Sequence, residues 1–94
     1  MSKILLVEDD VKIRTILKEI LIEKNHDVDE AGDGQDGFRK LEQGIYDLCI
    51  CDIKMPKMDG LEVLDRTKEA GIATNFVVIS AHGNIDIAVE AVKK

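Results

Sequence analysis

Short, continuously apolar runs alternate with longer amphipathic segments along this chain. Three runs stand out: residues 4–7, 48–51 and 76–79. Continuous apolarity over about four residues is typical of strands that are buried on both faces. A weaker strand is predicted over residues 27–31, where only the second and fifth positions are apolar.

A helical period follows each of the first two predicted strands. In the first helix, one stripe at 3.6-residue spacing comprises Ile13, Ile16, Leu17, Ile20 and Leu21. The opposite side is predicted to carry Lys12, Arg14, Lys18, Glu19 and Glu23. The second helix follows a Gly-Asp-Gly turn at 32–34, has Phe38 and Leu41 on its inner face, and ends near Gly44.

Two more helices are predicted in the second half of the chain. The third begins at residues 59–62, which have the form of a capping box, buries Leu61 and Leu64, and ends at Gly71. The fourth follows the strand at 76–79 and is predicted to start at Asn84. Its apolar positions are Ile85, Ala88, Ala91 and Val92. The alternation of four strands and four helices predicts an α/β fold, a parallel sheet with right-handed crossovers and helices on both faces.

Composition narrows the class of protein. The 94 residues, 45% hydrophobic and 34% charged, fit one small globular domain. A net charge of −6 argues against direct nucleic-acid binding, because phosphate neutralisation needs a basic face. No apolar run approaches the ~18 residues that span a membrane, and no signal peptide begins the chain. We therefore expect a cytoplasmic protein.

The two cysteines, Cys49 and Cys51, lie two residues apart on a predicted strand and should point to the same face. A disulfide between them would distort the backbone, and a metal site would need further thiols. We expect both to be small core side chains.

Polar residues follow the predicted strands. Glu8 and Asp9 come directly after the first apolar run, Asp52 ends the third strand, and Ser80 follows the fourth. In a parallel sheet all carboxyl ends lie along one edge, where open α/β folds keep their ligand crevices. We therefore expect these side chains to converge there, with Asp52 as the reactive group.

Converging carboxylates repel one another unless they share protons or bind a cation. An all-oxygen cluster suits Mg²⁺, and the chemistry that fits such a site is phosphoryl transfer to a carboxylate, with Ser80 offering its hydroxyl to the phosphoryl oxygens. Asp10 fits a helix cap better than a ligand. His26 and His82 fit exposed loop positions.

The motifs together resemble the receiver domain of bacterial two-component response regulators. They are Glu8-Asp9 after Ile-Leu-Leu-Val, Asp52 followed by Met55-Pro56 and Asp59-Gly60, and Ser80-Ala81 after a strand. Their order and spacing match over essentially all 94 residues. The run from Ser80 to Lys94 is similar to receivers of the nitrogen-regulation class of transcription activators.

The resemblance implies a flavodoxin-like fold and a specific assignment of roles. Asp52 would accept a phosphoryl group from a sensor histidine kinase. Mg²⁺ would be bound by Asp9, Asp52 and the Lys54 carbonyl, with Glu8 reaching the ion largely through water. Ser80 would be the switch hydroxyl. A transcriptional output domain beyond Lys94 would respond to the change.

The chain departs from the family at its carboxyl end. Receivers continue for about 25 to 30 residues, with a fifth strand that carries a lysine and then a fifth helix. Residues 1–94 are therefore expected to be an incomplete receiver domain. A bare edge on the fourth strand should then pair with another copy of the chain, as a homodimer through the fourth-strand and fourth-helix face.

Two other functions compete with the phosphorylation switch. One is a receiver-like interaction module that is never phosphorylated. The other is a Mg²⁺-dependent phosphatase with a strand-end aspartate nucleophile. Such phosphatases typically place an acid two residues after the nucleophile, where this chain has Lys54.

Overall fold

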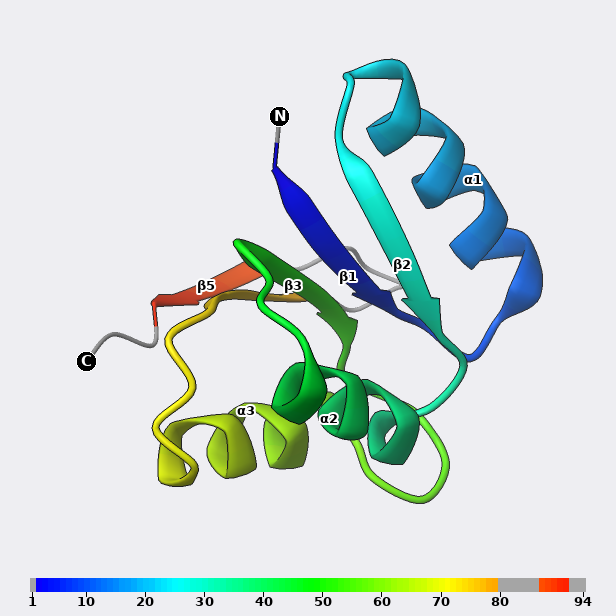
Figure 1. Cartoon of the computed structure of the whole chain (residues 1–94). Coiled ribbons are helices and arrows are strands. Elements are labelled where there is room, and N and C mark those ends of the chain that lie inside the picture. The colour runs from blue at the N-terminus through cyan, green and yellow to red at the C-terminus, as the bar shows by residue number, and fades with distance from the viewer. Residues whose placement is uncertain (1, 80–86, 92–94) are drawn as a thin grey trace.

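The computed structural model describes residues 2–79 and 87–91 of the chain. Its elements alternate along most of the sequence (Figure 1). In order they are β1 (Lys3–Val7), α1 (Val11–Glu23), β2 (Asp27–Ala31), α2 (Gly34–Gln43), β3 (Leu48–Asp52), α3 (Gly60–Glu69), β4 (Asn75–Ile79) and β5 (Ile87–Ala91). None of the described helices has the length and apolarity needed to cross a bilayer.

The strands form one sheet in the order β2-β1-β3-β4-β5. The first four strands are parallel, as predicted, and the weak prediction over residues 27–31 is confirmed as β2. The carboxyl ends of β1 and β3 lie side by side, with Val7 paired to Cys51, and Asp52 at the end of β3 is paired to Ile79. The α/β fold with a flavodoxin-like parallel core is therefore confirmed.

The fourth predicted helix is wrong. Residues Ile87–Ala91 form β5, which runs antiparallel to β4 with Val77 opposite Val89. Alternating Ile87 and Val89 suit a strand as well as a helix, and the unpaired edge of β4 offers hydrogen bonds that favour the strand. In the described residues the edge of β4 is covered by β5 of the same chain, and the homodimer through this face stays a prediction. The predicted cap Asn84 and the apolar positions Ile85 and Val92 lie outside the described residues.

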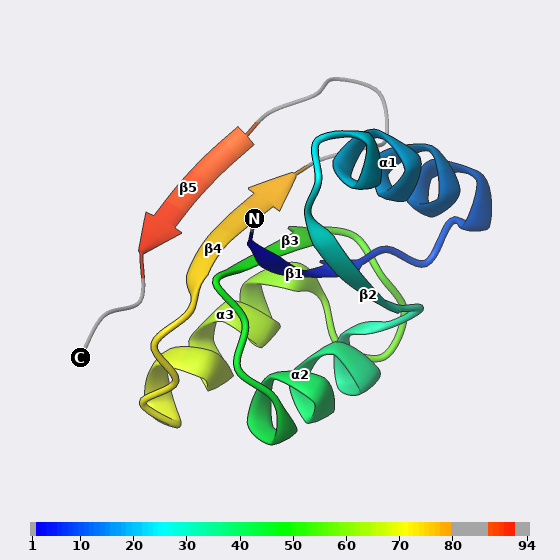
Figure 2. The same ribbon diagram turned by 45° about the horizontal axis from the view of Figure 1, so that its top comes forward.

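Helices lie on both faces of the sheet, but unequally (Figure 2). Helices α2 and α3 together cover one face, whereas α1 is the one described helix on the other, alongside β1 and β2. The α2/α3 side contains the main core, to which the two central strands contribute Leu5, Val7, Cys49 and Cys51. Both cysteines are fully buried free thiols, as predicted.

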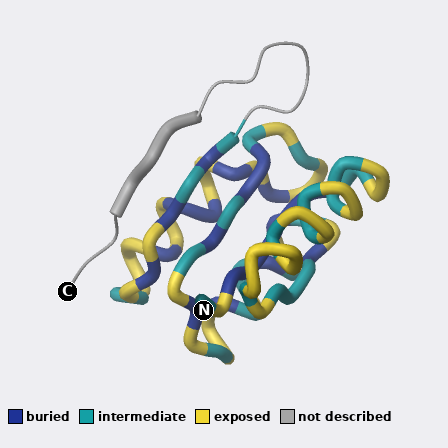
Figure 3. The backbone as a smooth tube through the Cα atoms, turned by 90° about the horizontal axis from the view of Figure 1, so that it is seen from above, coloured by how far each residue is buried: buried dark blue, intermediate teal, exposed yellow. Residues whose placement is uncertain are grey.

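The face that carries α1 is more open. No residue of α1 is buried, and two positions of its predicted apolar stripe, Ile16 and Ile20, are 58% and 45% exposed. Buried and half-buried positions alternate along the central strands (Figure 3). On this face Ile50 and Val77 are only half-buried, whereas their neighbours Cys51 and Val78 on the other face are buried.

Aspartate caps start all three helices in the part of the chain that the structure describes. The side chain of Asp10 accepts from the N–H groups of Lys12 and Ile13, and Asp33 and Asp59 accept from the N–H groups three residues further on. Asp10 is thus the cap that the sequence predicted. Glu62, expected to reach back to the cap of α3, instead accepts from Arg66 one turn later.

The inner face of α3 differs from the predicted one. Leu64 is buried, but Leu61 is 52% exposed. The buried positions are Gly60, Val63, Leu64 and Thr67, an i, i+3, i+4, i+7 stripe that starts at the first helical residue. The helix ends as predicted, with Ala70 as cap and Gly71 at φ 70°.

Candidate functional site

Asp52 closes β3 and is fully buried. The chain leaves the strand, forms the loop 53–59 and returns at once to the strand end, where the Gly60 N–H donates to the Ile53 carbonyl at 2.9 Å. A Cβ atom on Gly60 would lie 2.3 Å from the Asp52 carbonyl oxygen. Only glycine therefore allows the first turn of α3 to lie this close to the end of β3.

Glu8 and Asp9 follow β1 on the neighbouring strand. The Glu8 N–H donates to the Ala31 carbonyl at 3.1 Å, which extends the pairing with β2 by one residue. Glu8 Oε2 accepts from the Asp10 N–H at 3.0 Å. This bond curls the loop tightly between β1 and α1, so Glu8 is fully buried and Asp9 half-buried.

The two strand ends bring three carboxylates together. Glu8, Asp9 and Asp52 each offer one oxygen, and these atoms all lie within 4.8 Å of one another. The prediction that the carboxyl ends of β1 and β3 converge is confirmed. We call these three residues the acidic cluster.

The acidic cluster contains charge that the described protein atoms do not fully satisfy. Glu8 Oε1 and Asp9 Oδ1 are buried and accept no hydrogen bond from any described residue. The pKa of Glu8 is raised to about 8, first by burial and then by the neighbouring Asp9 and Asp52, while the hydrogen bond from the Asp10 N–H acts in the opposite direction. Without a proton or a cation, the ionised cluster therefore costs folding free energy.

The donor set fits a hard divalent cation. All the side-chain donors are carboxylate oxygens, which are the ligands that Mg²⁺ prefers in proteins. Buried acceptors without a donor are what such an ion would satisfy. The buried thiols do not belong to the site, since burial raises the pKa of Cys51 well above its usual range and keeps it protonated.

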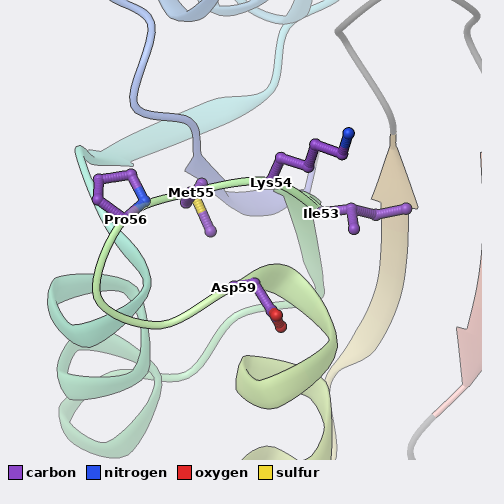
Figure 4. A pocket seen from close by; sticks show the side chains of 5 residues that line it. All are labelled: Ile53, Lys54, Met55, Pro56 and Asp59. Atoms are coloured by element: carbon purple, nitrogen blue, oxygen red, sulfur yellow. The ribbon is translucent and has the colours of Figure 1, made fainter.

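The other predicted site residues lie around the acidic cluster or outside the described residues. Lys54 is exposed on the loop after β3 and lines a pocket of about 530 Å³ with Ile53, Met55, Pro56 and Asp59. Figure 4 shows the pocket between this loop and the start of α3. Ser80 and His82 lie outside the described residues.

His26 has a partner that the sequence did not predict, because its Nδ1 accepts a hydrogen bond from the Ser2 N–H at 3.2 Å.

The sequence did not predict that Arg14 contacts a residue of the acidic cluster. Arg14 and Lys18, assigned to the side of α1 opposite the apolar stripe, are half-buried and face β2. Both pair with Glu30, and Arg14 also donates to the Glu8 carbonyl. The available signal was two cations one turn apart on a helix that precedes an acidic strand.

Comparisons with known proteins show which family the chain resembles. The family model of the response regulator receiver domain matches residues 4–94. The transcriptional regulatory protein DltR of Streptococcus agalactiae is 40% identical over 79 residues, which are 84% of this chain and 35% of DltR. The transcriptional regulatory protein ZraR of Klebsiella oxytoca is 36% identical over 90 residues, 96% of this chain and 20% of ZraR. ZraR fits the nitrogen-regulation class that the last residues resemble.

Solved structures have a similar fold. The response regulator TrrA of Thermotoga maritima, in complex with Mg²⁺ and BeF, is 36% identical with a TM-score of 0.83, over 88% of this chain and 72% of that one. TrrA bound to the histidine kinase ThkA gives a TM-score of 0.81 at 36% identity, over 89% and 72% of the two chains.

The chain spans about a third of the length of DltR and a fifth of the length of ZraR. Its strand order, its acidic strand ends and these matches agree, and the chain belongs to the response regulator receiver domain family.

Proposed function

We propose that this chain is a phosphorylation-dependent signalling switch in which Asp52 accepts a phosphoryl group with the help of Mg²⁺. The observation that carries the proposal is the acidic cluster, three carboxylates from two strand ends within 4.8 Å. The buried acceptors of Glu8 and Asp9 that lack a donor support a cation at this place. Receiver domains of response regulators are signalling switches rather than enzymes with an independent substrate.

The resemblance to receiver domains implies the role of each residue. Asp9 and Asp52 would hold Mg²⁺ with the Lys54 carbonyl, and Glu8 would act largely through water. The ion, when bound, supplies positive charge that screens the repulsion between an anionic donor and the Asp52 carboxylate. Ser80 would offer its hydroxyl to the phosphoryl oxygens as the switch residue.

The transfer itself forms one bond and breaks one. A carboxylate oxygen of Asp52 bonds to phosphorus while the bond from phosphorus to the donor nitrogen breaks, and the leaving histidine ring takes up a proton. Asp52 is fully buried, so this step requires that the donor phosphorus gain access to its carboxylate.

The relatives suggest what lies on either side of the switch. The complex of TrrA with ThkA supports a sensor histidine kinase as the phosphoryl donor. DltR and ZraR are named transcriptional regulatory proteins, and the part of them outside the match is the larger one. We therefore infer that residues 1–94 form the receiver part of a protein whose output domain controls transcription.

The test is covalent labelling of the chain. Incubation with acetyl phosphate and Mg²⁺, followed by intact-mass measurement, should show the gain of one phosphoryl group. Asp52→Asn should abolish the gain, and a chelator should suppress it. Asp65→Asn, which changes an exposed aspartate on α3, should leave it intact.

A gain that survives Asp52→Asn would place the phosphoryl group elsewhere and contradict the proposal. If the chain binds Mg²⁺ but acquires no adduct from acetyl phosphate, from beryllofluoride or from a histidine kinase, the unphosphorylated interaction module becomes the better description.

A further inference from the structure

Arg14 connects the acidic cluster to the far side of α1. Its Nη1 donates to the Glu8 carbonyl at 2.8 Å, and its Nε donates to Glu30 Oε1 at 3.3 Å. The side chain is only 20% exposed. One guanidinium thus bonds both the loop after β1 and the strand β2, which α1 lies alongside (Figure 1).

The Glu8 carbonyl is a sensitive place for this contact. It belongs to the peptide group that joins Glu8 to Asp9, so the bond from Arg14 restrains the backbone plane between two members of the acidic cluster. The Glu8 N–H is held by the Ala31 carbonyl, and Glu8 Oε2 by the Asp10 N–H. With these three bonds in place, Glu8 Oε1 is buried without a donor among the described residues.

Glu30 fixes the direction of the guanidinium. Lys18 donates to Glu30 Oε2 at 2.9 Å, so each carboxylate oxygen of Glu30 has one cationic partner. Lys40 of α2 donates to the Glu30 backbone carbonyl and anchors the same residue from the other face. Glu30, which orients the Arg14 guanidinium, is therefore itself fixed. Lys18 holds its side chain, and Lys40 holds its backbone carbonyl.

We propose that Arg14 is a positioning residue for the metal site, and that Glu30 orients Arg14. Arg14 holds the Glu8–Asp9 peptide so that both acids face Asp52, without itself contacting the ion or the phosphoryl group. Partners that orient ligands from outside typically change metal affinity by about 10- to 100-fold. The inference rests on the proposed function, because it assumes that the acidic cluster binds a divalent cation.

The experiment measures the affinity of the chain for Mn²⁺ alone, from the electron paramagnetic resonance signal of free Mn²⁺. Arg14→Gln should weaken binding by about tenfold or more. Arg39→Gln is the matched control, because Arg39 is 57% exposed and its ion pair among the described residues lies within α2, with Asp36. It removes the same charge and should change the affinity less than about twofold.

Two further variants separate geometry from charge and from stability. Arg14→Lys keeps the positive charge but loses the fork that bonds Glu8 and Glu30 together, so its affinity should fall between those of the native chain and Arg14→Gln. Glu30→Gln leaves Arg14 in place without its anchor and should also weaken Mn²⁺ binding. Metal-free hydrogen exchange should show faster exchange of the Asp10 amide in Arg14→Gln, with β3 and β4 unchanged.

The outcomes are distinguishable. Native-like affinity in Arg14→Gln overturns the inference and leaves the proposed function standing. Equal losses in Arg14→Gln and Arg39→Gln, or full affinity in Arg14→Lys, show that charge alone matters and also overturn it. If the native chain does not bind Mn²⁺, the proposed function fails and the inference fails with it.

Discussion

Two glutamates at neighbouring strands, Glu30 and Glu8, lie in opposite electrostatic environments. Glu30 of β2 is flanked by Lys18 and Arg14, and Lys18 first, then Arg14, hold its pKa below the usual range. Glu8, one residue past β1, is buried beside Asp9 and Asp52, and its pKa is raised to about 8.

The comparison of Glu30 with Glu8 separates a carboxylate that forms ion pairs from a carboxylate that lacks a cationic partner in the described residues. Ion pairs hold Glu30, Asp36 and Glu62 at the surface, each with a cation from the same chain. In the acidic cluster the carboxylates face one another instead. A cluster of this kind lowers stability, and a divalent cation is the partner that would reverse the cost.

The largest expected effect is the pH dependence of the metal-free chain. Because folding raises the pKa of Glu8 from 4.5 to about 8, the folded state holds a proton that the unfolded state has released between these values. The free energy of unfolding should therefore fall as pH rises from about 5 to about 8, by up to about 1.4 kcal/mol per pH unit from this group. Urea unfolding at several pH values without divalent ions measures it.

Glu8→Gln is the variant that tests this assignment. It removes the titrating group but keeps a similar shape, so the fall in stability over this pH range should become shallower and the variant should exceed the native chain at pH 8. An unchanged slope in Glu8→Gln would show that another group causes the pH dependence.

The next effect concerns the close approach of α3 to Asp52. Gly60→Ala places a Cβ 2.3 Å from the Asp52 carbonyl oxygen, so the strand end and the helix must separate. We expect a loss of about 1–3 kcal/mol in the free energy of unfolding, together with weaker Mg²⁺ binding. Gly32→Ala is the control for the free energy of unfolding alone, since among the described residues its Cβ would meet only Arg14 Nη1, at an ordinary 3.4 Å. Equal stability of the two variants would contradict the crowding at Gly60.

The smallest effect is expected on the paired glutamate. Glu30→Gln breaks two partly exposed ion pairs and should lower stability by about 1 kcal/mol or less at neutral pH and low salt. Because the pKa of Glu30 is lowered on folding, this contribution is present at neutral pH and is lost as pH falls through the acidic range, the opposite sign to Glu8. Glu62→Gln, which breaks an exposed i, i+4 pair with Arg66, should cost less.

Much of the site was predictable because it depends on a rule of topology. Buried parallel strands are continuously apolar, so the position at which each run ends could be read directly, and with it Glu8 and Asp52. Parallel strands all end at one edge, which is why the convergence of these acids could be predicted without any knowledge of side-chain geometry.

What could not be predicted depends on contacts between elements. The apolar positions of residues 87–91 fit the period of a helix and that of a strand. The strand forms because it pairs with the open edge of β4. Leu61 has the expected polarity for a buried position, but the rotation of α3 is set by the contact at Gly60. Arg14 lies where the helical period predicts a solvated charge, and only the position of Glu30 on β2 turns it toward the acidic cluster.

The most direct test of the central claim is the free energy of unfolding at pH 8 as a function of Mg²⁺ concentration, at constant ionic strength, for the native chain and Asp9→Asn. Binding to the folded state alone should stabilise the native chain by about 1.4 kcal/mol for each tenfold rise in Mg²⁺ above the dissociation constant. Asp9→Asn should need at least about tenfold more Mg²⁺ for the same gain. A native chain that Mg²⁺ does not stabilise, or an equal gain in Asp9→Asn, would contradict a cation site in the acidic cluster.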